Sequence, residues 1–211
     1  MATFTALEAS VYAVLRDTSK TFVLSTEVKE WINEAYLDIV ARTGLLRKEA
    51  TGTTSSVGEI TLPSDFVQVT SFWVATDDTN VNVSPEATRD EIFLSHRNNT
   101  TDISTTLYRI FNDTIETYPE AQSVSYVLEY VYKPTALSSG SDVPLIPEEL
   151  HVKLVNYARA NAKWKEGEDT EGDRYYALYR DGLPLAAPDA GRRNNPGSID
   201  FVPVPDYWDS V

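Results

Sequence analysis

Residues 25–44, STEVKEWINEAYLDIVARTG, contain the clearest helix in the chain, and the rest of the sequence is best interpreted outward from them. Ser25 is a suitable N-cap, and Gly44 stands where a left-handed residue ends a helix. Glu27 and Glu30 suit the positive end of the helix dipole. Apolar residues recur at spacings of three and four, which predicts one buried face over residues 25–43. That face consists of Val28, Trp31, Ile32, Ala35, Ile39 and Val40.

Directly after this helix the composition changes to one typical of strands. From Ala50 the chain is rich in Thr, Val and Ser, with turn clusters at 63–65 and 77–80. In the block TLYRIFNDTIETY, Asn112-Asp113 predicts a hairpin turn. In SVSYVLEYVYKP, large apolar residues alternate with smaller or polar ones. We therefore expect an antiparallel insert of about four to six strands over roughly residues 57–133.

Helical patterns return on both sides of this insert. Residues 5–16 predict a short helix, residues 147–166 a long helix opened by Pro147, and residues 173–181 a third that ends before Gly182. The order is helix, helix, strands, helix, helix. The fold class is therefore α+β, a helical bundle formed from both ends of the chain with an inserted antiparallel β region. We expect the helices at 25–43 and 147–166 to pack together.

The C-terminal residues differ from the rest. Five of the eleven prolines lie in the last 28 residues, which predicts an extended arm over 183–211 after a folded domain over 1–182. The arm cannot bury its own apolar side chains, so something must cover them. Folding back on the chain's own sheet and docking on another subunit or protein both remain open. The candidate partner-binding residues are Phe201, Val202, Val204, Tyr207 and Trp208.

Composition excludes several classes of function. Eighteen Lys and Arg against 32 Asp and Glu give a formal net charge of −14, which disfavours tight nucleic-acid binding. The chain has no cysteine, so disulfides and thiolate sites are excluded. No apolar run is long enough to span a membrane, and the first residues lack the features of a signal peptide. We expect a protein made in the cytoplasm, with no membrane partner.

No catalytic, cofactor or metal site is predicted. The acidic stretch 169–173 does not match a calcium loop and is interpreted as a solvated turn between helices. His151 is expected to be a surface residue beside Glu148, and His96 a loop residue. No nucleophile–base signature is present, so we expect no enzyme. The tyrosine-rich strands with Trp73 are interpreted as core or interface, with a carbohydrate platform as the alternative.

Three stretches resemble the head-to-tail adaptor proteins of tailed bacteriophages, also called head-completion or connector proteins. They are the helix with Asn33-Glu34-Ala35-Tyr36, the turn Leu62-Pro63-x-Asp65-Phe66, and the Pro144-x-x-Pro147 entry to a long helix followed by a Tyr-bearing one. The similarity covers about residues 25–182. The arm has no counterpart that can be matched residue by residue.

The resemblance implies a structural virion protein of the neck that forms a ring, usually of twelve copies, beneath the portal. It implies that the ring extends the DNA channel without binding DNA specifically and connects the capsid to tail or neck proteins. In that family the C-terminal segment commonly engages the portal. An acidic chain suits such a channel, because a basic lining would retain phosphates. The alternatives are another neck or tail-completion protein and a carbohydrate-binding structural module.

Overall fold

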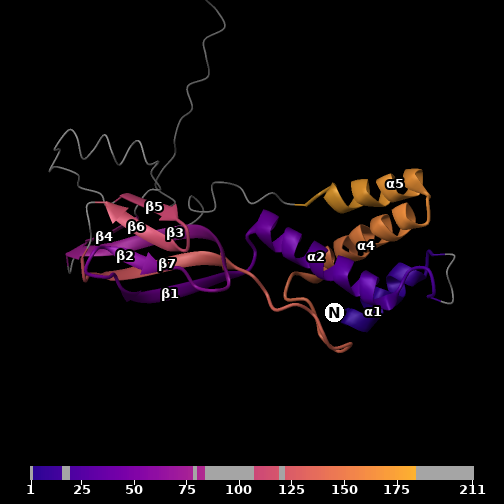
Figure 1. Ribbon diagram of the computed structural model, residues 1–211, viewed down its shortest axis with the longest axis horizontal. Coiled ribbons are helices and arrows are strands. Elements are labelled where there is room, and N and C mark those ends of the chain that lie inside the picture. The colour runs from indigo at the N-terminus through magenta and orange to yellow at the C-terminus, as the bar shows by residue number, and fades with distance from the viewer. Residues whose placement is uncertain (1, 16–19, 78–79, 84–106, 119–121, 184–211) are drawn as a thin grey trace, which may run out of the picture.

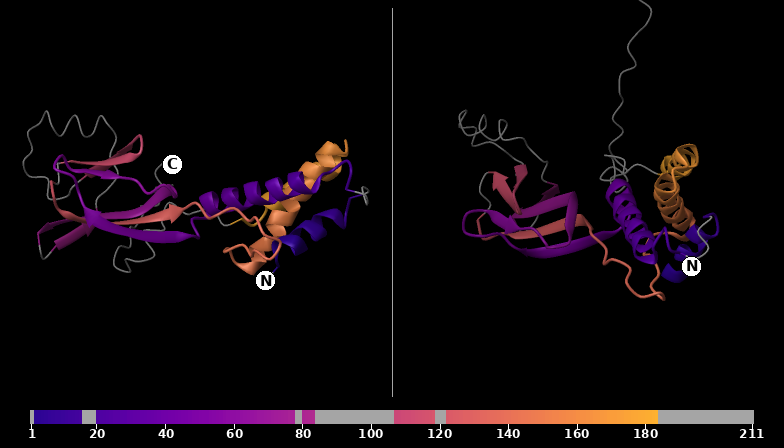
Figure 2. Two further views of the ribbon diagram at one scale, coloured as in Figure 1. Left: turned by 60° about the horizontal axis from the view of Figure 1, so that its bottom comes forward. Right: turned by 45° about the vertical axis from the view of Figure 1, so that its right-hand side comes forward.

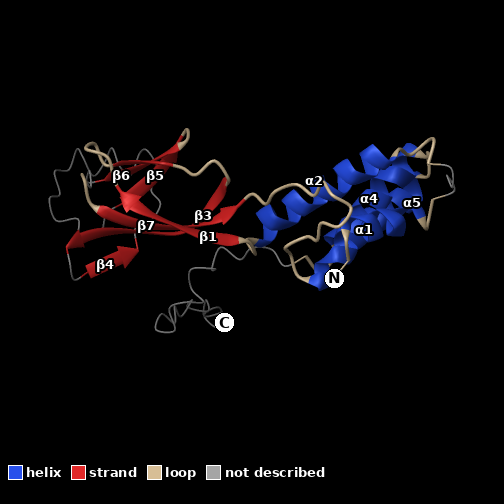
Figure 3. Ribbon diagram, turned by 90° about the horizontal axis from the view of Figure 1, so that it is seen from below, coloured by secondary structure: helices blue, strands red, loops and turns tan. Residues whose placement is uncertain are grey.

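The computed structural model describes residues 2–15, 20–77, 80–83, 107–118 and 122–183. These residues form an elongated subunit with helices at one end and strands at the other (Figure 1). The same separation is visible from the other directions in Figures 2 and 3. The predicted arm, apart from its first residue, lies outside the described residues. The α+β class with antiparallel strands is confirmed.

The helical end contains segments from both ends of the chain. The central helix α4 contacts α1, α2 and α5, and a short 3-10 turn, η1, precedes it. Apolar side chains of the four α-helices that the structure describes share one core, in which Ile32, Leu154 and Tyr179 are fully buried. The bounds are α1 Phe4–Tyr12, α2 Ser25–Thr43, η1 Glu148–Leu150, α4 His151–Lys165 and α5 Asp169–Arg180.

The bounds of α2 match the predicted residues 25–43, but only one of its two predicted caps is confirmed. Gly44 ends the helix in the left-handed region, with φ 59° and ψ 25°, as predicted. At the other end Leu24, not Ser25, is the N-cap residue, and its N–H donates to the Glu27 carboxylate at 2.9 Å. The Ser25 hydroxyl donates instead to the buried carboxylate of Glu8 at 2.8 Å. The N-cap prediction was therefore wrong by one residue, and the serine side chain contacts another helix.

The prediction of a solvated turn at 169–173 was also wrong. These residues form the first turn of α5, which therefore begins four residues earlier than expected. Gly167, at φ +79°, supplies the reversal between α4 and α5. Asp169 and Glu171 then lie at the positive end of the helix dipole, where carboxylates are stabilising. The acidic run is thus a helix start. The first helix, in contrast, ends earlier than predicted, at Tyr12.

The strands of the described residues form two antiparallel sheets. The larger has the order β1-β7-β3-β4 and the smaller the order β2-β6-β5. Asn112 and Asp113 form the predicted two-residue turn between β5 and β6, with Asn112 at φ 54°. In the larger sheet the bounds are β1 Arg47–Thr53, β3 Phe66–Asp77, β4 Asn80–Val83 and β7 Ser125–Tyr132. In the smaller they are β2 Glu59–Thr61, β5 Leu107–Phe111 and β6 Thr114–Tyr118.

The β end has a core of its own. Phe72 and Leu128 of the larger sheet and Ile115 of the smaller sheet are fully buried in it. The ring of Phe72 meets that of Tyr108 edge to face, with centroids 5.2 Å apart. The tyrosines that alternate along β7 therefore serve packing inside the subunit, as the core interpretation expected. Because each end has its own core, only a small number of contacts join the helical end to the β end.

The β region begins ten residues earlier than the sequence predicts. β1 starts at Arg47, and six of its seven residues are exposed. Such a strand shows no alternation of buried and exposed residues, which is the signal that predicts strands from sequence. Backbone pairing with β7 forms it instead. Within the described residues, no helix is both long and apolar enough to cross a membrane.

Candidate functional site

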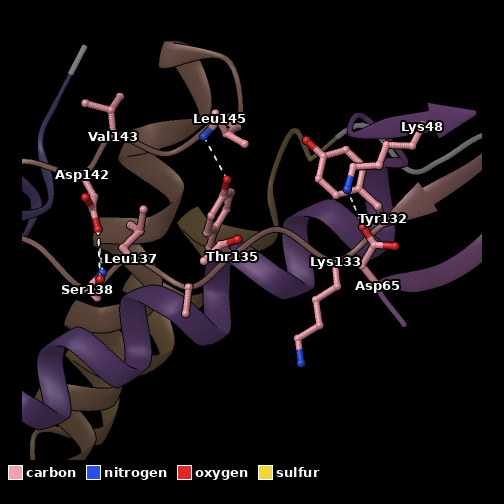
Figure 4. A pocket seen from close by; sticks show the side chains of 12 residues that line it. Lys48, Asp65, Tyr132, Lys133, Thr135, Leu137, Ser138, Asp142, Val143 and Leu145 are labelled. Carbon is pink, nitrogen blue, oxygen red and sulfur yellow. Dashed lines mark hydrogen bonds and ion pairs between the residues drawn. The ribbon is translucent and has the colours of Figure 1, made fainter. Parts of the chain in front are cut away.

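A cavity lies at the waist, where the helical end meets the β end. Its volume is about 530 Å³, and side chains or backbone from α2, β1, β7 and the irregular segment 133–147 line it (Figure 4). That segment leads from β7 to η1 without regular secondary structure. Its backbone groups therefore need partners other than a helix or a sheet. Side chains of the helical end supply several of them.

Asn33, near the middle of α2, holds the segment by two hydrogen bonds. Its amide nitrogen donates to the carbonyl of Leu137 at 3.0 Å, and its amide oxygen accepts from the N–H of Leu137 at 2.8 Å. The Leu137 side chain is buried in the helical core. One side chain thus satisfies both polar groups of a buried backbone residue that lies 104 positions away in the sequence.

Tyr36, one helical turn further along α2, holds the same segment at a second point. Its hydroxyl accepts a hydrogen bond from the N–H of Leu145 at 2.9 Å, drawn as a dashed line in Figure 4. The Tyr36 side chain is fully buried, and burial raises the pKa of its hydroxyl. Asn33 and Tyr36 are three residues apart, so they lie on the same face of α2. Together they attach the segment to the helix at residues 137 and 145.

On the β side of the waist, Asp65 is the centre of a polar cluster. Its carboxylate accepts from the Lys48 ammonium at 2.5 Å and from the Tyr130 hydroxyl at 2.9 Å. The same ammonium lies 4.2 Å from the centre of the Tyr132 ring, a cation–π contact. The hydrogen bond from Lys48 lowers the pKa of Asp65, and burial together with the Asp65 hydrogen bond raises that of Tyr130 to about 12. The cluster joins β1, β7 and the turn before β3.

A tight turn within the segment docks against the first helix. The Asp142 carboxylate accepts from the N–H groups of Ser138 and Ser139, both at 2.8 Å, and these bonds lower its pKa. The backbone carbonyl of Asp142 accepts in turn from the N–H of Phe4 at 2.8 Å. The first N–H groups of a helix have no partner within it, so the turn satisfies a free donor of α1.

The contacts at the waist join the helical end of the subunit to its β end. Lys48 forms an ion pair with Asp65, and the Asp142 carboxylate is engaged in turn contacts. Burial raises the pKa of the Tyr36 hydroxyl. Among the described residues no group of three or more His, Cys, Asp or Glu side chains is placed to hold a metal ion. The arrangement can transmit force or orientation between the two ends.

Replacing Asp65 by asparagine is expected to lower the free energy of unfolding by about 1–2 kcal/mol at neutral pH. The folded-state pKa of Asp65 is depressed, so its contribution is present above the unfolded value of about 3.9 and is lost as pH falls through the folded value. The difference in melting temperature between wild type and variant should therefore shrink toward about pH 3. The variant Glu49→Gln removes a carboxylate from the exposed strand β1 and serves as the control. A difference independent of pH would contradict this role for Asp65.

Of the two histidines, the structure describes only His151, and it corrects the prediction made for that residue. His151 is buried, not on the surface, and its Nε2 lies 3.2 Å from the carbonyl of Ile146. It was misplaced because its burial depends on the packing of α4 against the other helices. His96 and the arm residues Phe201, Val202, Val204, Tyr207 and Trp208 all lie outside the described residues.

The comparison with protein families bears directly on this architecture. A family model described as SU10 adaptor protein matches residues 2–200, nearly the whole chain. The chain belongs to this family. SU10 adaptor proteins are a head-to-tail adaptor family of bacteriophages, so the resemblance found in the sequence is confirmed. Membership implies a structural phage protein of the virion neck that interacts with head and tail components. No curated protein matches the chain.

Three residues with structural roles in this adaptor lie in the motifs that carried the resemblance. Asn33 and Tyr36 belong to the Asn-Glu-Ala-Tyr stretch, and Asp65 to the Leu-Pro-x-Asp-Phe turn. No structural role was predicted for these three residues from the sequence. A signal was present, since Asn33 and Tyr36 are polar groups beside an otherwise apolar helical face. Their partners are backbone groups, which have no sequence signature.

Proposed function

We propose that twelve copies of this adaptor form a closed ring beneath the portal, extend the DNA channel and connect the capsid to the tail. The observation that carries this proposal is the family match over residues 2–200. The elongated subunit supports it, because its helical end and its β end can face different partners (Figure 1). A ring that closes around DNA requires a heterologous interface, in which each copy presents two different surfaces to its neighbours.

Exposed apolar side chains support contact surfaces at both ends of the subunit. Phe22 is 52% exposed at the tip of the helical end, and Phe111 is 56% exposed at the hairpin of the smaller sheet. Leu145, beside the waist, is 63% exposed. Large apolar side chains at such positions are typical of residues that become buried on association. We propose that neighbouring copies or neck proteins cover them.

The charge of the chain supports a channel through which DNA slides. Each copy has a formal net charge of −14, and an acidic lining does not neutralise phosphates. A basic lining would bind DNA through counterion release and slow its passage. Repulsion between copies must then be offset by burial of apolar surface and by counterions. We expect ring formation to be stronger at higher salt concentration.

We propose that residues 1–182 form the adaptor domain and that residues 183–211 are a docking arm. Its anchors are Phe201, Val202, Val204, Tyr207 and Trp208, and it docks on the portal or on an adjacent subunit. Aromatic anchors bury a large area with few rotatable bonds, which favours them at interfaces.

Mixing the purified protein with its portal tests the proposed function. We expect a ring coaxial with the portal in electron micrographs, and a particle mass that corresponds to twelve copies per portal. The free protein is expected to be monomeric, because the portal supplies the template. A two-fold dimer retained in the assembled particle would contradict the proposal. Binding to a completed tail but not to the portal would favour a tail-completion protein.

A further inference from the structure

Among the described strands, β7 is the only neighbour of β1, so β1 is an edge of the larger sheet. The hydrogen bonds at both ends of this pair establish which backbone groups face β7. At one end the carbonyl of Leu46 accepts from the N–H of Tyr132 at 3.0 Å, and at the other the N–H of Thr54 donates to Val124 at 2.9 Å. Along an antiparallel pair, residues whose backbone groups bond to the partner strand alternate with residues whose backbone groups face away from it. The backbone groups that face outward are therefore those of Arg47, Glu49, Thr51 and Thr53.

The outer edge of β1 has no hydrogen-bond partner among the residues that the structure describes. Side chains do not cover it either, because only Ala50 is half-buried and the other six residues are exposed. A seven-residue strand with an unpaired edge is a template for pairing with another strand. The edge therefore needs a partner of complementary length and backbone pattern.

The C-terminal segment has the pattern of a strand that can pair along one edge only. Residues 198–206 read SIDFVPVPD, with β-branched or aromatic side chains at four positions. Successive residues of a strand direct their N–H groups to opposite edges, and proline has no N–H. Pro203 and Pro205 are two residues apart, so both lack a donor on the same edge. The opposite edge keeps the donors of Asp200, Val202, Val204 and Asp206.

We propose that residues 200–206 of one copy add to the outer edge of β1 of the neighbouring copy as an antiparallel strand. This inference rests on the proposed ring and names the surface that the arm occupies. The edge without prolines faces β1 and supplies a full set of donors. The edge with prolines faces outward and prevents the addition of a further strand.

Charge selects the register of the added strand. With Val204 opposite Glu49, Asp206 lies opposite Arg47 on the same face of the sheet, and the two side chains form an ion pair across the strands. From Asn194 onward the chain carries aspartates but no lysine or arginine, whereas β1 begins with Arg47 and Lys48. The acidic segment of one copy thus meets a basic strand start on the next, which opposes the repulsion between acidic copies.

Shape supports the same register. Phe201 lies opposite Gly52, the one β1 residue without a side chain. A Cβ atom on Gly52 would lie only 2.9 Å from the Tyr126 hydroxyl, so the tyrosine already leans over this position. An aromatic residue beside a strand glycine shields the exposed backbone. Phe201 therefore contacts the edge of the Tyr126 ring in the docked strand.

Disulfide trapping in the full-length protein tests the inference, because the natural chain has no cysteine. The single variants Glu49→Cys and Val204→Cys are mixed with the portal and oxidised. Directly opposed residues of a hydrogen-bonded antiparallel pair have Cα atoms about 5.5 Å apart, within disulfide range. We expect a covalent dimer in the mixture and none from either variant alone. In the control, Pro203→Cys replaces Val204→Cys, and we expect about tenfold less dimer because the side chain points to the opposite face.

The outcomes separate this inference from the proposed function. No dimer, or as much dimer with the control as with the test pair, would overturn the strand addition. In a double variant that carries both Glu49→Cys and Val204→Cys, a cross-link confined to single chains would overturn pairing between copies. Rings of the wild-type protein are scored independently by electron microscopy. Rings without the specific cross-link would support the proposed function and overturn the strand addition. The cross-link without rings would support the strand addition and overturn the proposed function.

A second variant removes a backbone donor without removing a side-chain contact. The N–H of Thr51 faces outward, so Thr51→Pro leaves the pairing of β1 with β7 intact. In the Glu49→Cys background it should reduce the yield of covalent dimer by about tenfold with an unchanged melting temperature, as loss of one hydrogen bond to the added strand predicts. Thr51→Val keeps the donor and should retain the cross-link. Equal yields from both variants would overturn backbone pairing at this edge.

Discussion

The variant Asn33→Ala is expected to lower the free energy of unfolding by about 2–4 kcal/mol, measured by urea denaturation. The substitution removes both hydrogen bonds to Leu137, at 2.8 and 3.0 Å. The backbone N–H and C=O of a buried residue then lose their partners, and each unsatisfied group costs about 1–3 kcal/mol. The partial exposure of the Asn33 side chain allows water to replace one bond, which keeps the expected value below the sum of two full penalties.

Asn161→Ala is the matched control for this variant. Asn161 is also a half-buried asparagine on a helix, but its amide donates at 3.0 Å to the carbonyl of Tyr157 in the same helix. That carbonyl lies within a helix that pairs it already, and alanine has the higher helix propensity. We expect a change within about 0.5 kcal/mol. Equal losses from both variants would show that Asn33 does not hold the segment 133–147 to α2.

Truncation after Pro196 is expected to abolish attachment to the portal while leaving the subunit folded. The two cores lie within residues 4–179, so removal of the last 15 residues takes no side chain from either. The removed residues include the strand 200–206 proposed to join neighbouring copies, and the anchors Tyr207 and Trp208 that follow it. An aromatic anchor contributes about 2 kcal/mol or more at a typical interface hot spot. Loss of several anchors therefore weakens binding by many orders of magnitude. Circular dichroism and thermal melting measure the fold, and cosedimentation with portal measures attachment.

The double variant Tyr207→Ala with Trp208→Ala is a finer version of the same experiment. It keeps the length and the charge of the arm, and it should weaken attachment by about a thousandfold if each anchor contributes about 2 kcal/mol. Asp209→Asn is the control and should alter mainly the association rate. Attachment that survives truncation would contradict the docking role. A large loss of subunit stability on truncation would instead indicate that the arm folds back on its own chain.

The helices were the most predictable part of this adaptor. The bounds of α2 follow from its apolar spacing and from Gly44, because a helix is made of hydrogen bonds between residues four apart. The hairpin at Asn112-Asp113 was predictable for the same reason, since a two-residue turn is decided by its own residues. Membership in the family was also visible from the motifs around Asn33 and Asp65.

The sequence-based errors share a cause. At the start of α2 the N-cap is Leu24, and the Ser25 hydroxyl donates to Glu8 of another helix. The strand β1 was placed too late because pairing with β7, and not its own pattern, makes it a strand. The burial of His151 depends on the packing of α4 against the other helices. In each case a contact distant in the sequence overrode a local preference.

The sequence alone therefore determined the helices, through their apolar periodicity, and the turns, through their turn residues. It also determined the net charge of −14. The joint between the two ends was decided only by the tertiary structure. Its bonds join Asn33 to Leu137 and Tyr36 to Leu145, pairs separated by 104 and 109 residues. Local periodicity reports which side chains share a face, because those neighbours lie within one or two helical turns. Backbone groups look alike at every position, so only the folded chain selects which of them a given asparagine or tyrosine will meet.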